Sequence, residues 1–434
     1  MKIGKLKLQM VFCLAFIMII AGSAKLKAQQ IDSTWTVINS TNYSGTSLNN
    51  ALNALIAQGK TKFYISDGVY NLDGNIVINQ PNIIIQGQSK DNTKLVQTNA
   101  SRNTIEISSD NVQVSNLNIN NQAGGISVSC HNSNNVSVEN CAIYGAKNNH
   151  AIVFVKDGTD DIADVENNNL NLNNIVEKNQ IYSNYAGDGV FFSKQGYGTL
   201  DNNVIIGTRV AFYLSRNSEV SYNVIENSPT NGIRYAVPAY DNKIVGNTIE
   251  NSNYSGISVA RENTAATPTN YRANNLKIDN NTIIGARYFG IEASNLKGSE
   301  MVGNNIDSPD YNGIYALYSD ALTISQNHIS NSNYNLKGGK LNSWDTTYDS
   351  GIMIDYMVTN SNIDSNTIIN LTNSCPFGVR IQPDPSNTYN NITNNTISGY
   401  FDNAISSKVE SPFYNVIGTD NTISLIPQPT SLNK

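Results

Sequence analysis

Short stretches that alternate apolar and polar residues recur through most of the chain. One unit is glycine or alanine followed by apolar-x-apolar, as in GISVA at 256–260 and GIYAL at 313–317. The other is Asn-x-Ile or a close variant, as in NTI at 247–249 and NHI at 327–329. Alternation with period two is typical of a β-strand with one buried face. Both units return every 20–24 residues where no insertion intervenes.

Asn, Gly, Asp and Ser separate these short strands, and the paired two-residue turns of a hairpin meander are missing. Strands that recur in one register instead predict coils stacked on one another, which is the architecture of a parallel β-helix. An asparagine at the bend before Asn-x-Ile can adopt the left-handed conformation. Stacked from coil to coil, such residues are expected to form amide ladders.

The residues at 46–59 predict a helix that caps the open N-terminal coil, with Thr46 or Ser47 as its N-cap. Its apolar face consists of Leu48, Ala51, Leu52, Leu55 and Ile56. The first coil is expected to begin at FYISDGVYNL, residues 63–72.

Residues 1–28 have the lysines, apolar core and small residues of a signal peptide, with cleavage expected after Ala24 or Ala28. We therefore expect a secreted or periplasmic protein without a membrane span, in which residues 29–434 form a single β-helix domain. Loss of five leader lysines leaves 23 basic and 34 acidic residues. This acidic balance disfavours a nucleic-acid partner. The remaining cysteines are odd in number, so no disulfide framework is expected; they are Cys130, Cys141 and Cys375.

The segment FYISDGVYNL, the later NIVINQPNIIIQGQ and the repeats that follow resemble the pectin-lyase-like right-handed β-helix superfamily. The resemblance covers nearly the whole mature chain and implies a right-handed parallel β-helix, or solenoid, with an N-terminal capping helix. That superfamily includes lyases, hydrolases, epimerases and phage tailspikes, so the fold alone does not define the chemistry. The Asp-Pro-His-Asp segment of β-helix mannuronan epimerases and the arginine motif of pectate lyases are not found.

The second residue after each glycine or alanine is expected to point outward, because the residues on either side of it are apolar. This outward row is predicted to contain Ser127, Val153, Phe191, Tyr213, Arg234, Ser258, Glu292, Tyr315, Met353 and Arg380. Tyr213 is thus expected beside Arg234, roughly 5 Å away on the preceding coil. At the turn that follows, cations recur as Lys156, Lys194, Arg216 and Arg261, and aromatic residues as Tyr318 and Tyr356.

Three coils carry insertions at the edges of this face, at 157–177, 262–274 and 334–350. Long loops in a compact repeat are often functional, and these are expected to form the walls of a cleft. Arg272, Trp344 and Tyr348 are candidates to close over a bound chain.

A cationic groove lined with tyrosines suits an anionic polysaccharide, and we expect a monomeric polysaccharide lyase with alginate as the first candidate substrate. In β-elimination, Arg234 and Arg216 would neutralise the uronate carboxylate, Lys194 would act as the base, and Tyr213 or Tyr315 as the acid. The residues expected to bind substrate are Lys156, Phe191, Arg261, Glu292, Tyr315, Tyr318, Tyr356 and Arg380.

Two alternatives remain open. A glycoside hydrolase needs two carboxylates, and Glu292 and Asp355 are expected two coils apart, roughly 10 Å, with Asp188 and Asp349 nearby. A binding protein without catalysis would use the same aromatic and charged residues. No cofactor is expected, although calcium is possible in the acidic insertion, at Asp157, Asp160, Asp161, Asp164 and Glu166.

Overall fold

The computed structural model describes residues 31–43, 48–158, 162–184, 187–261, 271–333, 350–371, 375–400 and 404–425. Two compact units are distinguished, Met1–Thr36 and Val37–Lys434. The second unit carries the fold described below, and of the first only residues 31–36 are described. The predicted signal peptide therefore lies outside the described residues. β1 (Thr36–Ile38) spans the boundary between the two units.

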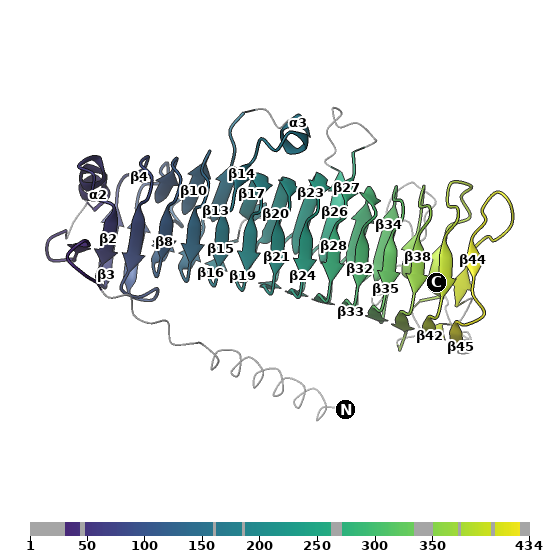
Figure 1. The fold of residues 1–434 in the computed structure, drawn as a ribbon. Coiled ribbons are helices and arrows are strands. Elements are labelled where there is room, and N and C mark those ends of the chain that lie inside the picture. The colour runs from purple at the N-terminus through teal and green to yellow at the C-terminus, as the bar shows by residue number, and fades with distance from the viewer. Residues whose placement is uncertain are drawn as a thin grey trace, which may run out of the picture. The chain divides into compact units, whose positions relative to one another are not determined.

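The unit from Val37 onward is built from three long parallel sheets, called A, B and C, and each coil of the chain visits them in that order (Figure 1). Sheet A consists in spatial order of β2 (Lys62–Ile65), β5 (Ile84–Gly87), β8 (Gln113–Ser115), β11 (Ser137–Glu139), β15 (Ile175–Glu177), β18 (Thr199–Asp201), β21 (Glu219–Ser221), β24 (Lys243–Val245), β28 (Lys277–Asp279), β32 (Glu300–Val302), β35 (Thr323–Ser325), β38 (Asn362–Asp364), β41 (Asn391–Thr393) and β44 (Val416–Ile417).

Sheet B follows the same order along the coils. Its strands are β3 (Gly68–Leu72), β6 (Thr93–Gln97), β9 (Asn118–Asn120), β12 (Ala142–Tyr144), β16 (Gln180–Tyr182), β19 (Val204–Ile206), β22 (Val224–Glu226), β25 (Thr248–Glu250), β29 (Thr282–Ile284), β33 (Asn305–Asp307), β36 (His328–Ser330), β39 (Thr367–Ile369), β42 (Thr396–Tyr400) and β45 (Thr422–Leu425).

Sheet C contains the longest strands. Its main path is β4 (Ile76–Ile78), β7 (Ile105–Ile107), β10 (Val128–His131), β13 (Ile152–Val155), β17 (Asp188–Gly196), β20 (Arg209–Arg216), β23 (Ile233–Tyr240), β26 (Ile257–Arg261), β30 (Ile291–Ser294), β34 (Ile314–Leu317), β37 (Ser350–Ile354), β40 (Phe377–Ile381) and β43 (Ile405–Ser406). Three short strands extend it beyond the main path: β14 (Asn171–Leu172), β27 (Ala273–Asn274) and β31 (Leu296–Lys297). This architecture is a parallel β-helix, as the repeats predicted, and it is right-handed, as the family resemblance implied.

The core lies between the three sheets because one face of each strand is apolar and points inward. Four aromatic rings on successive strands of sheet C illustrate the stacking inside the coils. Ring centroids are 4.8 Å apart between Phe154 and Phe192, 4.5 Å between Phe192 and Phe212, and 5.1 Å between Phe212 and Tyr235. All four side chains are fully buried. Burial of such a continuous apolar column is the main source of stability in a fold of this kind.

A buried amide ladder joins the coils at the bend between sheets A and B. Each side-chain Nδ2 donates to the Oδ1 of the next member at 2.9–3.0 Å. The residue before each member, except the one before Asn421, is in the left-handed conformation, and it is often not asparagine, as at Tyr222 and Gln326. The ladder consists of Asn179, Asn203, Asn223, Asn247, Asn281, Asn304, Asn327, Asn366, Asn395 and Asn421.

The predicted N-terminal helix is present as α2 (Leu48–Ala57), at the same end of the coils as β2 and β4 (Figure 1). Leu48, Leu52 and Ile56 are buried on its inner face. The two candidate N-cap residues lie outside the described part of the chain. Neither α2 nor the short α3 (Ile162–Glu166) is long enough to cross a membrane, and the described residues contain no other helix.

Candidate functional site

The outer face of sheet C carries a row of side chains that is continuous from coil to coil. The strand register aligns the central members of this row, because Arg234 pairs with Ala211 and Ser258, and Glu292 pairs with Ser258 and Tyr315. The whole row, called the face row below, is Ser129, Val153, Phe191, Ala211, Arg234, Ser258, Glu292, Tyr315, Met353 and Arg380.

Two members of the predicted row were misplaced by two residues. Tyr213 pairs with Ser193 and Ala236, so Ala211 rather than Tyr213 lies beside Arg234. In the earlier coil Ser129 takes the place expected for Ser127. A slip of two residues keeps the same face outward, so alternation alone does not distinguish the two registers. Tyr213 remains close to the row, with its ring edge-on to Phe191 at 5.0 Å between centroids.

A carboxylate and a tyrosine stand next to each other in the face row, because Glu292 pairs in register with Tyr315. The Glu292 carboxylate is half-buried and accepts a hydrogen bond from Ser258 Oγ at 2.7 Å. On the neighbouring strand, the Tyr315 hydroxyl donates to Asp355 Oδ2 at 2.6 Å, and its ring stacks on Phe289 at 4.5 Å. The Tyr315 side chain is 6% exposed, and its hydroxyl is held in place by the Asp355 carboxylate.

Arg234 supplies a cation to the same row, two strands before Glu292. This separation corresponds to roughly 10 Å between the backbones. Asp355 follows β37, two strands beyond Glu292, as the sequence predicted for this pair. The face row therefore combines a guanidinium, a carboxylate and a tyrosine–carboxylate pair. Arg380 lies further along it, with its guanidinium 4.8 Å from the ring centroid of Phe377.

Lys194, expected as the catalytic base, does not project from the face. Its side chain is 1% exposed, and its ammonium lies 2.9 Å from the carboxylate of Asp164 in α3. The hydrogen bonds from Lys194 and Asn169 lower the pKa of Asp164, so this partner is ionised at neutral pH. The backbone of Lys194 is in the left-handed conformation, at φ 54°, within a bend of β17. The structure thus places Lys194 in an ion pair that attaches the first insertion.

The other predicted cations are spread over the corner between sheets C and A. Arg216 pairs in register with Gly196 and Tyr240, not with Lys194 as predicted, because β20 continues two residues further. Lys156 and Arg261 are half-buried near the ends of their strands. Tyr318 and Tyr356 are exposed at this corner, with rings edge-on at 5.4 Å.

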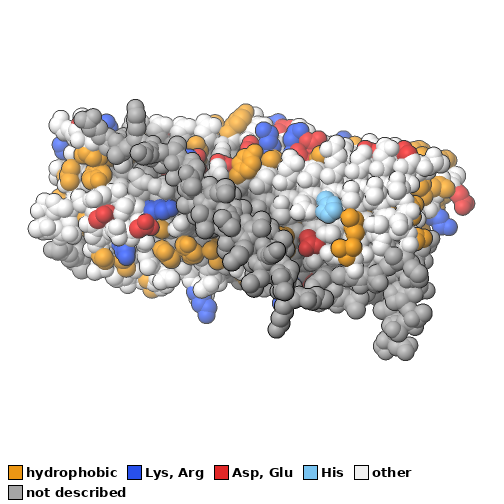
Figure 2. All heavy atoms as spheres, turned by 90° about the horizontal axis from the view of Figure 1, so that it is seen from below, with side chains coloured by type: hydrophobic (Ala, Val, Ile, Leu, Met, Phe, Trp, Pro, Cys, Tyr) orange, Lys and Arg blue, Asp and Glu red, His pale blue; other side chains and the backbone are white. Residues whose placement is uncertain are grey.

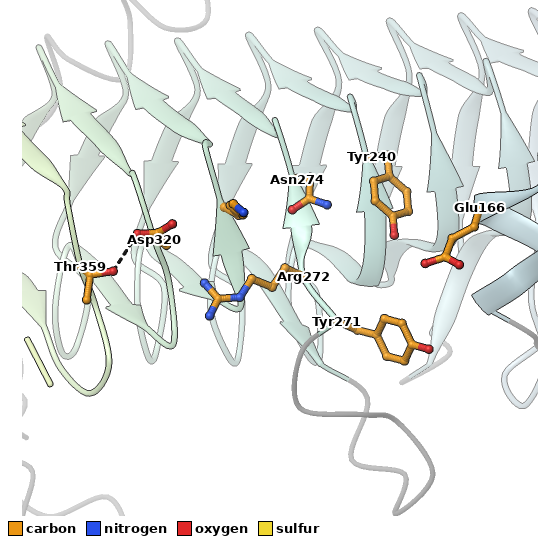
Figure 3. A pocket seen from close by; sticks show the side chains of 8 residues that line it. Glu166, Tyr240, Tyr271, Arg272, Asn274, Asp320 and Thr359 are labelled. Carbon is orange, nitrogen blue, oxygen red and sulfur yellow. Dashed lines mark hydrogen bonds between the residues drawn. The ribbon is translucent and has the colours of Figure 1, made fainter.

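Two insertions form the walls of a pocket at this corner, which we call the ledge pocket. Its volume is about 530 Å³. Figure 3 shows the side chains that line it, and they come from α3, from the residues before β27 and from a row of successive coils. The lining residues are Glu166, Tyr240, Tyr271, Arg272, Asn274, Lys297, Asp320 and Thr359. The sequence indicated Arg272 and the insertions, but not Tyr240, Lys297 or Asp320.

The third insertion, including Trp344, Tyr348 and Asp349, lies outside the described residues.

On the side of the molecule that carries sheet B, charged side chains are few and scattered where the residues are described (Figure 2). The outer face of sheet C and its adjoining corner are therefore the candidate functional region.

The family models that match the chain agree with the fold. A model described as "Right handed beta helix region" matches residues 269–428, and one described as "Periplasmic copper-binding protein (NosD)" matches residues 80–275. The chain is a right-handed parallel β-helix. No curated protein sequence matches it.

Solved β-helix structures match almost the whole chain at low sequence identity. The A-module of the mannuronan C-5 epimerase AlgE4 of Azotobacter vinelandii is 13% identical, with a TM-score of 0.54 over 92% of this β-helix and 100% of that module. The catalytic unit of the GH87 α-1,3-glucanase of Streptomyces thermodiastaticus is 15% identical, with a TM-score of 0.56 over 93% of this chain and 73% of that one. The Dettilon tailspike protein is 13% identical, with a TM-score of 0.54 over 89% of this chain and 70% of that one. At these identities the comparisons show the fold alone.

The described residues do not fit the copper named in one family description. Copper favours thiolate, thioether and imidazole ligands, and within the described ranges no group of three His, Cys, Asp or Glu side chains converges. Cys130 and Cys141 are buried, and burial raises the pKa of Cys141 to about 12. The imidazole of His131 is bonded to Ser129 and Asp157, and that of His150 to the backbone oxygen of Asp188.

The acidic insertion does not gather its described carboxylates into a calcium site either. Asp157 accepts hydrogen bonds from His131 and Asn132, whereas Asp164 pairs with Lys194. Glu166 lines the ledge pocket. Asp160 and Asp161 lie outside the described residues.

Proposed function

We propose that this β-helix is an exported, monomeric polysaccharide lyase that cleaves an anionic, uronate-containing polysaccharide on the outer face of sheet C. The observation that carries the proposal is the row in which Arg234, Glu292 and the Tyr315–Asp355 pair face the same side within five neighbouring strands. The description of one matching family as periplasmic supports export.

In the proposed reaction Arg234 binds the uronate carboxylate and stabilises the negative charge that develops on it when the C5 proton is removed. Glu292 accepts that proton, and this role replaces the one expected for Lys194, which is held by Asp164. The electron pair of the C5–H bond forms the C4–C5 double bond as the C4–O4 bond breaks. Tyr315 donates its phenolic proton to the leaving oxygen, and Asp355 orients the phenol.

Alginate is the first polymer to test, because a structural relative is named for its action on mannuronan and shares the need to remove a C5 proton. An epimerase would return a proton to C5 without breaking the chain. A glycoside hydrolase is the second candidate, because Glu292 and Asp355 provide two carboxylates on one face.

The test is incubation of the mature protein with alginate, polygalacturonate, chondroitin sulfate and heparan sulfate, with and without a chelator. The lyase produces new ultraviolet absorbance from the unsaturated uronate. A hydrolase produces new reducing ends without that absorbance, and an epimerase incorporates deuterium from heavy water at C5 without either. If none of these signals appears, the protein is a binding protein or acts on another polymer.

A further inference from the structure

The ledge pocket is built on a second row of residues, which continues sheet C around the corner. Arg216 pairs with Tyr240, Tyr240 with Asn274, and Asn274 with Lys297. Single bridges extend the row from Lys297 to Asp320 and from Asp320 to Thr359. The row thus presents one side chain per coil, at the usual strand spacing of about 4.8 Å.

The charged side chains that line the ledge pocket differ in the contacts that they make within the protein. The Asp320 carboxylate accepts hydrogen bonds from Asn360 Nδ2 at 2.8 Å and from Thr359 Oγ1 at 2.7 Å. These two bonds, with the nearby charges of Arg272 and Lys297, lower the pKa of Asp320. Asp320 is therefore an ionised part of the wall, and its Oδ1 accepts both of these hydrogen bonds.

The second acid of the pocket, Glu166, lies near Tyr240. Burial raises the pKa of Tyr240, and the charge of Glu166 raises it further, so its phenol is protonated at neutral pH. Figure 3 shows Tyr271 extending toward the Glu166 side of the pocket and Arg272 extending toward the Asp320 side. Tyr240 and Tyr271 thus add two aromatic rings to the end of the pocket that lies away from Asp320.

The two cations of the pocket are available to a ligand. The structure records no hydrogen bond or ion pair of the side chains of Arg272 and Lys297 with any described residue. Arg272 is half-buried and Lys297 is exposed, and both line the same pocket. A carboxylate placed between them would receive charge-assisted hydrogen bonds, which are among the stronger contacts proteins make.

We propose that the ledge pocket binds a carboxylated sugar residue, with its carboxylate held by Arg272 and Lys297 and its ring against Tyr240 or Tyr271. The identity of the polymer to which this sugar belongs rests on the proposed function. β23 connects the two regions, since Arg234 lies six residues before Tyr240, which is at most about 20 Å along a strand. A uronate chain on the face row would therefore bend around the corner to reach the ledge pocket.

The test compares Arg272→Ala/Lys297→Ala with Lys94→Ala/Arg102→Ala, a double variant that removes the same charges from exposed positions outside the pocket. Both are made in a Glu292→Gln background, and binding of an alginate hexasaccharide is measured by calorimetry. We expect the pocket variant to bind at least about ten-fold more weakly, while the control variant is unaffected. Equal affinities of the two would overturn the proposal, provided that circular dichroism and melting temperatures show both to be folded.

A second arm separates this proposal from the lyase. With Glu292 restored, the pocket variant should show a raised KM on polymeric alginate and an unchanged kcat. Weaker binding of the hexasaccharide without any cleavage by the wild type would support the pocket and reject the lyase. If the wild type cleaves alginate but the pocket variant binds the hexasaccharide as tightly as the control variant, the lyase is supported and the pocket is rejected. If the hexasaccharide does not bind even to the protein with an intact pocket, the pocket is rejected for this sugar.

Discussion

The Lys194 ammonium lies 2.9 Å from the Asp164 carboxylate, and through this contact a strand of sheet C holds the short helix of the first insertion. Glu166, two residues after Asp164, lines the ledge pocket. The ion pair therefore positions one wall of the pocket.

Replacing Asp164 by Asn should destabilise the protein by about 3 kcal/mol, because it leaves the buried Lys194 ammonium without its carboxylate. The exposed pair of Glu177 and Lys178 provides the control, since Glu177→Gln should cost less than about 1 kcal/mol. Unfolding in urea measures both. The double variant Lys194→Met/Asp164→Asn should recover most of the loss, and failure to recover would show that other contacts hold α3.

Asp279 gives a pH dependence of stability. Burial and the nearby charge of Glu300 raise its pKa from 3.8 to about 6 in the folded protein. As the pH rises, the Asp279 carboxyl ionises in the unfolded chain before it ionises in the folded protein. Its contribution to stability is therefore full below about pH 4 and declines as the pH rises to about 6. Asp279→Asn should remove this decline and stabilise the protein at pH 7 by about 1 kcal/mol, after allowance for solvent screening.

Asp364 provides the opposite case for the same measurement. Hydrogen bonds from Asn394, Thr393 and Ser365 lower its pKa, so its contribution to stability is present at neutral pH and is lost in acid. Asp364→Asn should therefore destabilise the protein at pH 7. A gain in stability on this substitution would contradict the sign derived from these contacts.

Within the amide ladder, neighbouring residues provide a matched comparison. Asn304 is buried, and its Nδ2 donates to Ile278 O at 2.7 Å and to Asn327 Oδ1 at 2.9 Å, whereas Asn305 is exposed. Asn304→Ala should reduce the free energy of unfolding by about 3 kcal/mol, because several buried polar groups lose their partners. Asn305→Ala should change it by less than about 0.5 kcal/mol. Similar effects at both positions would argue against a structural ladder.

The thiols of Cys130 and Cys141 should not react in the folded protein. Both are buried, and burial raises the pKa of each, that of Cys141 to about 12. The reactive thiolate is therefore nearly absent at pH 8. Mass spectrometry after treatment with iodoacetamide should find these residues unmodified in the native protein and modified after unfolding. Modification of the native protein would reveal local opening of the coils.

On the face row, Tyr315→Phe and Glu292→Gln should each lower kcat by about a hundred-fold or more, since each removes a proton-transfer group. Tyr318→Phe is the control, because Tyr318 is an exposed tyrosine at the corner. Circular dichroism verifies folding. Wild-type turnover in Tyr315→Phe would exclude this phenol as the acid, and loss of turnover in the control would point to the corner instead.

The fold was predictable because period-two alternation and a recurring coil length are direct consequences of stacked strands. The register was not fully predictable. In β20 the apolar residues Val210, Phe212 and Leu214 all lie at even-numbered positions, and the strand begins at Arg209 without a glycine. The prediction placed the small residue at 211 where other coils have glycine. This shifted the predicted register of β20 by two residues, so the predicted neighbours of Tyr213 and Arg216 were wrong.

The site was partly predictable for a similar reason. Outward positions such as Arg234, Glu292 and Tyr315 follow from alternation, since their neighbours are apolar. The fate of Lys194 does not, because its burial depends on a left-handed bend and on an acid thirty residues earlier in the chain. The ledge row was missed because it lies beyond the alternating segments, where only the coil-to-coil register aligns Tyr240, Lys297 and Asp320.

Along the main path of each sheet, every strand between the two end strands pairs with the strand one coil earlier and the strand one coil later. The strand partners of a segment are thus only a few tens of residues away in sequence. Such a chain can acquire its structure by adding one coil at a time to an existing edge, without waiting for a distant segment. The N-terminal coils, closed by α2, are the natural first template, and a chain that emerges from its N-terminus presents its coils in the order in which they stack.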